Sequence, residues 1–175
     1  MNRPARAVLV ALVAAVSALV LVAPGAADTS GSETFNGVIV TSGTSGDRVV
    51  VSSVVRAKGV FNGVGRLVEI PNLPGDPDNV SRDDLVFPEG TMHLVSTTLD
   101  FSLSLNPKSC RFTAVLDQTG QIVGGTGQFA AASGSATATV TGQGILPRNH
   151  DGSCSGEQAS LHEVDMIASS GTLSF

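Results

Sequence analysis

The stretch Gly124-Gly125-Thr126-Gly127-Gln128-Phe129 says more about the fold of this chain than any other part of its sequence. It directly follows the apolar run 121–123 and precedes a run of small residues, 130–134. Glycine accepts positive φ and lets two backbones approach closely, so three glycines in four residues predict a tight corner between strands. Phe129 is expected to fill that corner. The motif is therefore interpreted as structural.

Segments with β propensity, separated by glycine, proline or asparagine, recur along the rest of the chain. The composition, rich in Val, Thr, Ser and Gly and without Trp or Tyr, favours strands and turns over helices. The expected strands are residues 35–41, 48–58, 60–70, 91–97, 99–105, 111–117, 135–142 and 161–169. This spacing predicts an all-β meander sandwich or barrel, and the glycines at 59, 63 and 65 favour the bending that closes a barrel.

Two local patterns add detail to this map. Leu99, Phe101, Leu103 and Leu105 alternate with polar residues, which predicts an apolar face turned to the core; continued backward, the alternation places His93 on that face. Residues 71–89 contain four prolines and several acids and are expected to form one long acidic surface loop.

The pattern GGTG-x-F-x-x-A-x-G over residues 124–134 resembles that of the allene oxide cyclase and dirigent barrels and of small secreted bacterial proteins that share their fold. The likeness covers residues 91–175 best. It implies a single antiparallel barrel of about eight strands around a cavity, with the first strand closing against the last. The enzymes of the family cyclise an unsaturated fatty-acid epoxide, and the dirigent members steer radical coupling of phenols. Their sites use tyrosine and paired acids. This chain has no tyrosine, so no catalytic residue is carried over.

The N-terminus has the pattern of a secretory signal peptide over residues 1–27. Arg3 and Arg6 precede an apolar run, 7–22, which ends in small residues suited to cleavage before Asp28. The sequence therefore predicts a signal helix followed by one β-barrel domain, 28–175, and a secreted or envelope location.

The charge of the chain argues against two classes of partner. The formal net charge of −5 becomes −7 once Arg3 and Arg6 are removed, and there is no basic cluster, so nucleic acid is not expected to bind. The alternating C-terminus ending in Phe175 is similar to the last strand of an outer-membrane barrel, but the chain lacks the aromatic residues of a membrane girdle. We expect no stable membrane insertion after cleavage.

Cys110 and Cys154 both lie beside turn-forming residues. In an oxidising compartment this indicates a disulfide; a metal pair or reactive thiol is the alternative, but no further histidine or cysteine has ligand spacing. The glycines at 125 and 127 formally match a dinucleotide fingerprint, yet a strand-like segment follows where a helix is needed. No metal or cofactor is predicted.

Three functions remain open on the sequence alone. The protein could bind a small apolar ligand inside the barrel, act as a non-enzymatic envelope or extracellular partner protein, or be a cyclase-like or dirigent-like isomerase. For the isomerase, the candidate acid–base or charge-stabilising residues are His93, Arg66 and Glu69. Arg66 and Glu69 are three residues apart, so only one can face inward from an unbroken strand. We predict Arg66, at a wet barrel mouth.

Overall fold

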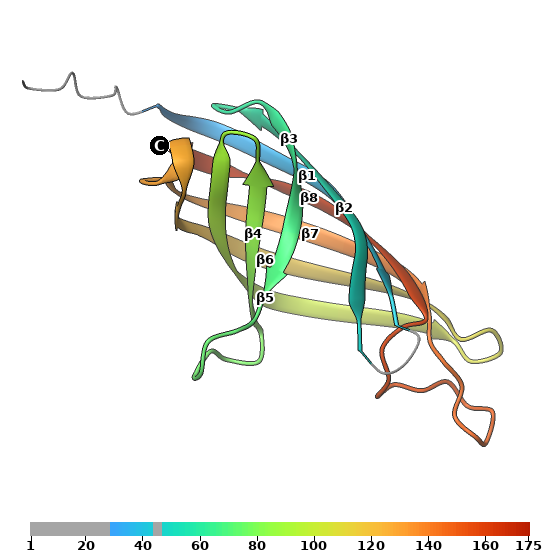
Figure 1. Cartoon of the computed structure of the whole chain (residues 1–175). Helices are drawn as coiled ribbons and strands as arrows, with labels where there is room; N and C mark the ends of the chain where they lie inside the picture. The colour runs from blue at the N-terminus through green and yellow to red at the C-terminus, as the bar shows by residue number, and fades with distance from the viewer. Residues whose placement is uncertain (1–28, 44–46) are drawn as a thin grey trace, which may run out of the picture.

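The computed structural model describes residues 29–43 and 47–175 and shows a closed antiparallel barrel of eight strands in chain order (Figure 1). The strands are β1 (Ser30–Ser42), β2 (Val49–Gly59), β3 (Gly63–Ile70), β4 (Val80–Phe87), β5 (Gly90–Asn106), β6 (Arg111–Gly125), β7 (Ser133–Ile145) and β8 (His162–Ser174). β8 pairs with β1 from Ser30↔Ser174 to Thr41↔Glu163, which closes the barrel. The prediction of an all-β, eight-stranded antiparallel barrel is confirmed. The predicted signal peptide lies outside the described residues.

The connections between strands differ at the two ends of the barrel. One end carries the short connections 60–62, 88–89 and 126–132 together with the N-terminus of β1 and the C-terminus of β8. The other end, called the mouth here, carries the β1–β2 connection and the segments 71–79, 107–110 and 146–161. The short 3-10 helix Gly127–Phe129 is part of the first end. Among residues 29–43 and 47–175, no helix is long and apolar enough to cross a membrane.

Four phenylalanines close the end opposite the mouth, and we call them the phenylalanine plug: Phe61, Phe87, Phe129 and Phe175. Phe129 is completely buried, and its ring packs edge-on against Phe61 and Phe175 with centroid distances of 5.0 and 5.2 Å. Such edge-to-face pairs add to the hydrophobic gain of burial. The predicted role of Phe129 as the filler of the corner is confirmed.

The glycine corner itself has the expected geometry. Gly124, near the end of β6, has a φ of +118°, and Gly127, in the connection between β6 and β7, has a φ of +60°. A Cβ on Gly125 would lie 1.9 Å from the carbonyl oxygen of Thr91 on the neighbouring strand β5. The glycines therefore allow β6 to turn within contact of the β4–β5 hairpin, and the structural interpretation of the motif is confirmed.

The predicted loop over 71–89 is wrong in its second half, because residues 80–87 form β4. The proline-containing segment 71–79 is a true connection. Arg82, on β4, donates hydrogen bonds to both carboxylate oxygens of Asp76 in this segment, at 2.7 and 3.0 Å. These bonds, with a backbone N–H from Leu73, lower the pKa of Asp76 to about 2. Of the acids in this stretch, Asp76 and Asp78 thus lie in the connection, and Asp83 and Asp84 lie in β4.

The two strands predicted at 91–97 and 99–105 are one long strand, β5, with a bulge at Leu99. The bulge reverses which residues face inward: Met92, Leu94 and Ser96 before it, then Phe101, Leu103 and Leu105 after it. β4 pairs with β5 only as far as Thr97, so the second half of β5 extends past the barrel wall (Figure 1). Phe101 and Leu103 are consequently 56% and 52% exposed, and the prediction that this apolar row is core is wrong.

A disulfide joins Cys110 to Cys154 and confirms the predicted pairing. It ties the β5–β6 turn to the long β7–β8 connection at the mouth. The backbone N–H of Leu146 also donates to the carbonyl oxygen of Cys110 at 2.9 Å. A disulfide of this kind fits an extracytoplasmic location.

Candidate functional site: a cavity at the barrel mouth

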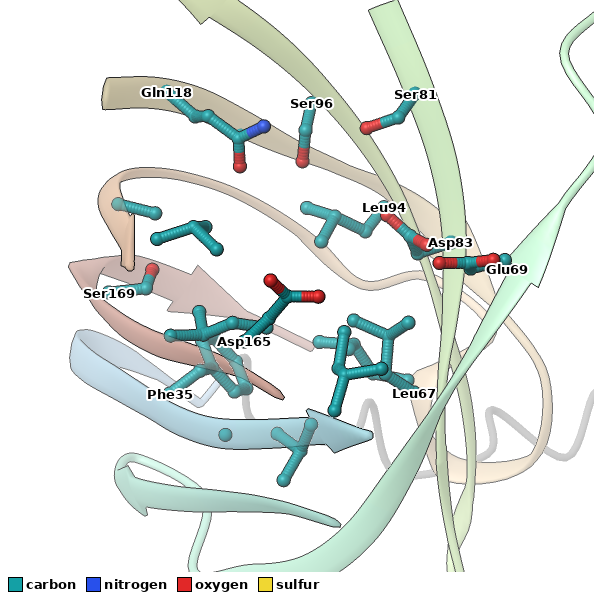
Figure 2. A pocket seen from close by; sticks show the side chains of 18 of the residues that line it. Phe35, Leu67, Glu69, Ser81, Asp83, Leu94, Ser96, Gln118, Asp165 and Ser169 are labelled. Atoms are coloured by element: carbon teal, nitrogen blue, oxygen red, sulfur yellow. The ribbon is translucent and has the colours of Figure 1, made fainter. Parts of the chain in front are cut away.

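The barrel encloses a cavity of about 550 Å³ between the phenylalanine plug and the mouth. This volume lies inside the range of roughly 300–1,000 Å³ that is usual for small-molecule sites. Most of the wall is apolar, and its larger side chains include Ile39, Ile122 and Ile167 as well as Phe35, Leu67 and Leu94, which Figure 2 labels. The sequence does not determine whether the interior of the barrel is open or filled, and the structure shows that it is open at this end.

Small residues on the inward face explain why the barrel is hollow. The inward positions of β7 include Ala136 and Ala138, which stand beside Gly120 on β6 in the cavity wall. On the other side of β8, β1 contributes Gly37. A small barrel is normally filled by its own inward side chains, so replacing several of them by glycine and alanine leaves room for another molecule.

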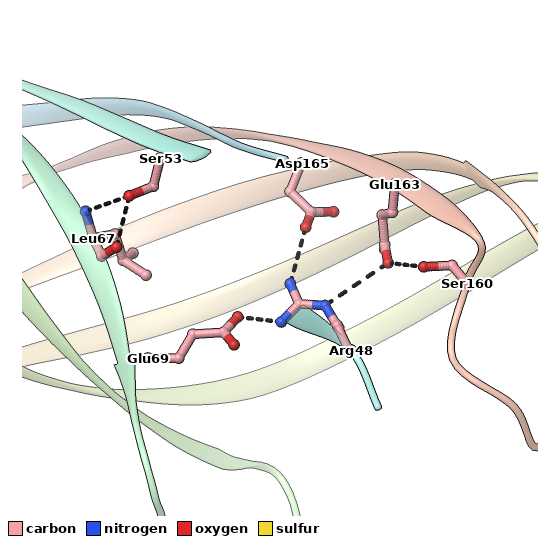
Figure 3. Close-up of polar contacts among 7 residues, drawn as sticks. All are labelled: Arg48, Ser53, Leu67, Glu69, Ser160, Glu163 and Asp165. Atoms are coloured by element: carbon pink, nitrogen blue, oxygen red, sulfur yellow. Dashed lines mark hydrogen bonds and ion pairs between the residues drawn. The ribbon is translucent and has the colours of Figure 1, made fainter. Parts of the chain in front are cut away.

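A cluster of charged residues lines the mouth of the cavity and is centred on Arg48 (Figure 3). The Arg48 guanidinium forms ion pairs with Glu69 on β3 and with Asp165 and Glu163 on β8, the last two at 3.3 and 3.9 Å. Ser160 donates a further hydrogen bond to Glu163 at 2.8 Å. One guanidinium thus serves three carboxylates.

Asp83 adds a fourth carboxylate to the mouth. It lies directly opposite Glu69 in the β3–β4 ladder, and Figure 2 shows the two carboxylates side by side in the cavity wall. Within the part of the chain that the structure describes, Asp83 has no hydrogen bond or ion pair. Partial burial and the neighbouring charge of Glu69 raise the pKa of Asp83 to about 6.

Asp165 is in a similar state on the other side of the mouth. Its side chain is only 10% exposed, and it points into the cavity (Figure 2). Burial, followed by the charge of Glu163, raises the pKa of Asp165 to about 6 in spite of the nearby Arg48 guanidinium. Space for these carboxylates comes from Gly142 on β7, where a Cβ would lie 2.7 Å from Asp165 Oδ1.

Neutral polar groups continue this surface into the cavity. Ser96 on β5 is only 7% exposed, and it lines the cavity. Its hydroxyl makes no hydrogen bond to any described residue. Beside it, Gln118 on β6 donates to Thr98 Oγ1 at 3.1 Å (Figure 2 labels Ser96 and Gln118). The Ser96 hydroxyl is therefore a hydrogen-bonding group whose partner is not found in 29–43 or 47–175.

The structure places the three predicted candidate residues differently from one another. Arg66 is exposed, and it shares the outer face of β3 with Val64, so the prediction that Arg66 points inward is wrong. Glu69 is the residue that lines the cavity. Leu67 fixes this outcome, because it is buried in the core, and residues that differ by two positions share a face.

His93 also lies outside the cavity. Its Nδ1 is 2.7 Å from Asp84 Oδ1, directly across the β4–β5 ladder on the outer face. The backward extension of the Leu99–Leu105 alternation failed because the bulge at Leu99 shifts the phase by one residue. Neither His93 nor Arg66 is therefore placed for chemistry in the barrel.

Sequence reasoning missed the residues that dominate the mouth: Arg48, Asp83, Glu163 and Asp165. A signal for two of them was present, because Glu163 and Asp165 are two residues apart in an expected strand and must share a face. The convergence of Arg48 and Asp83 on that face depends on the pairing of β2, β3 and β4, which one sequence does not show. The described residues contain no group of three or more His, Cys, Asp or Glu arranged to hold a metal ion.

Comparison with known proteins gives no relative from which a function can be transferred. No protein-family model, no curated protein and no solved structure matches this chain. The cavity and the chemistry of its wall are therefore the features of the protein that indicate a function.

Proposed function

We propose that this protein is exported and binds a small, mainly apolar molecule inside the barrel. The observation that carries the proposal is the cavity of about 550 Å³, lined by large aliphatic side chains and Phe35 and left open by glycine and alanine on β1, β6 and β7. A few polar groups at one end of an apolar pocket are the usual arrangement for orienting a ligand.

The two ends of the barrel give such a ligand one direction of entry. The phenylalanine plug fills the far end with buried rings, whereas the mouth is bordered by the longer connections 71–79 and 146–161. An apolar body would lie against Leu67, Leu94 and Ile122, and any polar group would remain near the carboxylates at the mouth. The fold thus supports binding of a ligand that enters through the mouth.

Filling the cavity tests the proposal. The neutral fluorescent probe N-phenyl-1-naphthylamine is expected to gain fluorescence on binding to the mature protein. Ala138 lines the wall, so Ala138→Phe places a ring in the cavity. This substitution is expected to lower the apparent affinity for the probe at least tenfold. Ala168→Phe is the matched control, because Ala168 lies on the exposed outer face of the adjacent strand β8. Equal binding by both variants, or no binding by the unaltered protein, would contradict the proposal.

A further inference from the structure

The mouth of the cavity carries more negative charge than its own cations neutralise. Four carboxylates line it: Glu69, Asp83, Glu163 and Asp165. Arg48 pairs with three of them, and Arg82, which also borders the cavity, is already held by Asp76 in a two-point ion pair. Among the described residues Asp83 has no ion pair: it faces Glu69, and the nearby Arg48 is already paired with the other three carboxylates.

We propose that the ligand is an amphiphilic amine, whose ammonium group binds between Asp83 and Asp165 while its apolar body fills the barrel. This inference rests on the proposed function and specifies its ligand class. An ammonium group brings the positive charge that the mouth lacks, and it has up to three N–H donors for the acceptors around it.

The Ser96 hydroxyl is the second observation that points to a ligand at this place. It is 7% exposed, lines the cavity and has no partner among the described residues. Buried polar groups are nearly always hydrogen-bonded, and this hydroxyl is reached only from the cavity, so a molecule bound there can supply its partner. Ser96 neighbours Ser81 across the β4–β5 ladder, two residues from Asp83, which places the hydroxyl next to the acidic wall.

The arrangement also makes binding depend on pH. The charged groups that face Asp83 are Glu69 on β3, Arg48 before β2, and the adjacent Asp84; β5 brings only Leu94 opposite it. Asp165 faces Arg48 and Glu163, and its ladder partners on β1 and β7 are the uncharged Ile39 and Gly142. Both carboxyls have a pKa of about 6 without ligand. A bound cation favours their ionised forms, so affinity for an amine falls as the pH drops through this range.

Three probes with one alkyl chain and different head groups test the inference: decylamine, decan-1-ol and decanoate, measured by displacement of N-phenyl-1-naphthylamine from the mature protein. At pH 7.5 we expect decylamine to bind at least tenfold more tightly than decan-1-ol, and decanoate to bind most weakly. The advantage of decylamine should shrink several-fold at pH 5. An alkylammonium, like the lysine side chain, is fully charged at both values, so this loss reports on the protein.

Substitutions then test which carboxylate binds the ammonium group. Asp83→Asn is expected to remove most of the preference for decylamine over decan-1-ol, and Asp84→Asn, on the outer face of the same strand, is expected to leave it unchanged. Equal affinities of the unaltered protein for decylamine and decan-1-ol would overturn the amine inference while leaving the proposed function intact. Failure of all three probes and of the fluorescent probe would contradict the proposed function itself.

Discussion

The glycines of the corner and of the cavity wall act through the space that they leave. Gly125 allows β6 to lie against the backbone of Thr91, and Gly142 leaves room for the Asp165 carboxylate. At Gly125 the obstacle is a backbone oxygen, which cannot move aside without disturbing β5. At Gly142 the obstacle is the end of the Asp165 side chain, which can move aside. The same residue type therefore has a structural task at one position and a site-forming task at the other.

Gly125→Ala should destabilise the fold strongly for this reason. The added Cβ would lie 1.9 Å from the Thr91 carbonyl oxygen and 2.8 Å from that of Phe129. We expect a loss of about 3 kcal/mol in the free energy of unfolding, as for a severe overpacking substitution. Urea denaturation measures it.

The control for this substitution is Gly156→Ala. Gly156 has no atom within 4 Å of a Cβ, so its change should stay within about 0.5 kcal/mol. Equal stability of both alanine variants would mean that the close approach of β6 to β5 is not needed.

At the scale of single strands, the sequence predicted elements well where the signal was local. The corner at 124–129 depends on neighbouring residues and is found where it was predicted, at the junction of two strands. Both strands are longer than predicted: β6 is Arg111–Gly125 against an expected 111–117, and β7 is Ser133–Ile145 against an expected 135–142. β4 was missed, because its acids Asp83 and Asp84 and the prolines on both sides are typical of a loop; the strand forms because β3 and β5 pair with it. Propensity is weak evidence when pairing decides.

The errors about the site have a common physical origin in strand phase. One bulge at Leu99 moved His93 to the outer face and turned Phe101 toward the open side of the barrel. A shift of one residue exchanges the two faces of a strand. Because the bulge arises from the pairing of β5 with β6, the periodicity of β5 alone could not reveal it.

The disulfide joins two connections at the mouth, the β5–β6 turn and the β7–β8 connection. Cys110 and Cys154 close a loop with a sequence separation of 44 residues. The chain-entropy model assigns about 4 kcal/mol to a loop of this size. We expect the double variant Cys110→Ser/Cys154→Ser to lose stability of that order in urea denaturation.

Reductant provides the control for the disulfide prediction. It should destabilise the unaltered protein and have no effect on the double variant. Intact-mass measurement without reductant should show the protein two hydrogen atoms lighter than the dithiol form. Two alkylatable thiols in the exported protein would contradict the pairing.

At the scale of the whole molecule, stability and binding are assigned to opposite ends of one barrel. The phenylalanine plug and the core residues around it bury apolar surface at the closed end, where Phe129 and Met92 have no exposed area. The mouth holds carboxylates that repel one another and are only partly neutralised by Arg48. Such a site costs stability that the rest of the barrel must offset, which is a common property of functional sites.

The acidic mouth predicts that this barrel is more stable at mildly acidic pH than at neutral pH. The folded-state pKa of about 6 for Asp83 and Asp165 is above the ordinary value of 3.8, so between these values the folded protein binds more protons than the unfolded chain. Stability contributed by these groups is therefore present below about pH 4 and lost as the pH rises through 6. Asp76, whose pKa is lowered to about 2, acts in the opposite direction only at lower pH.

Asp83→Asn should remove part of this cost at neutral pH. Since each pKa unit corresponds to about 1.4 kcal/mol, we expect a gain of about 1–2 kcal/mol in the free energy of unfolding at pH 7.5 and a much smaller one at pH 4.5. Asp84→Asn loses the outward contact with His93 and should give no gain at either pH. Urea denaturation at the two pH values separates these outcomes. A loss of stability in Asp83→Asn at pH 7.5 would show that Asp83 stabilises the empty barrel, and the mouth would then have no unpaired charge to offer a ligand.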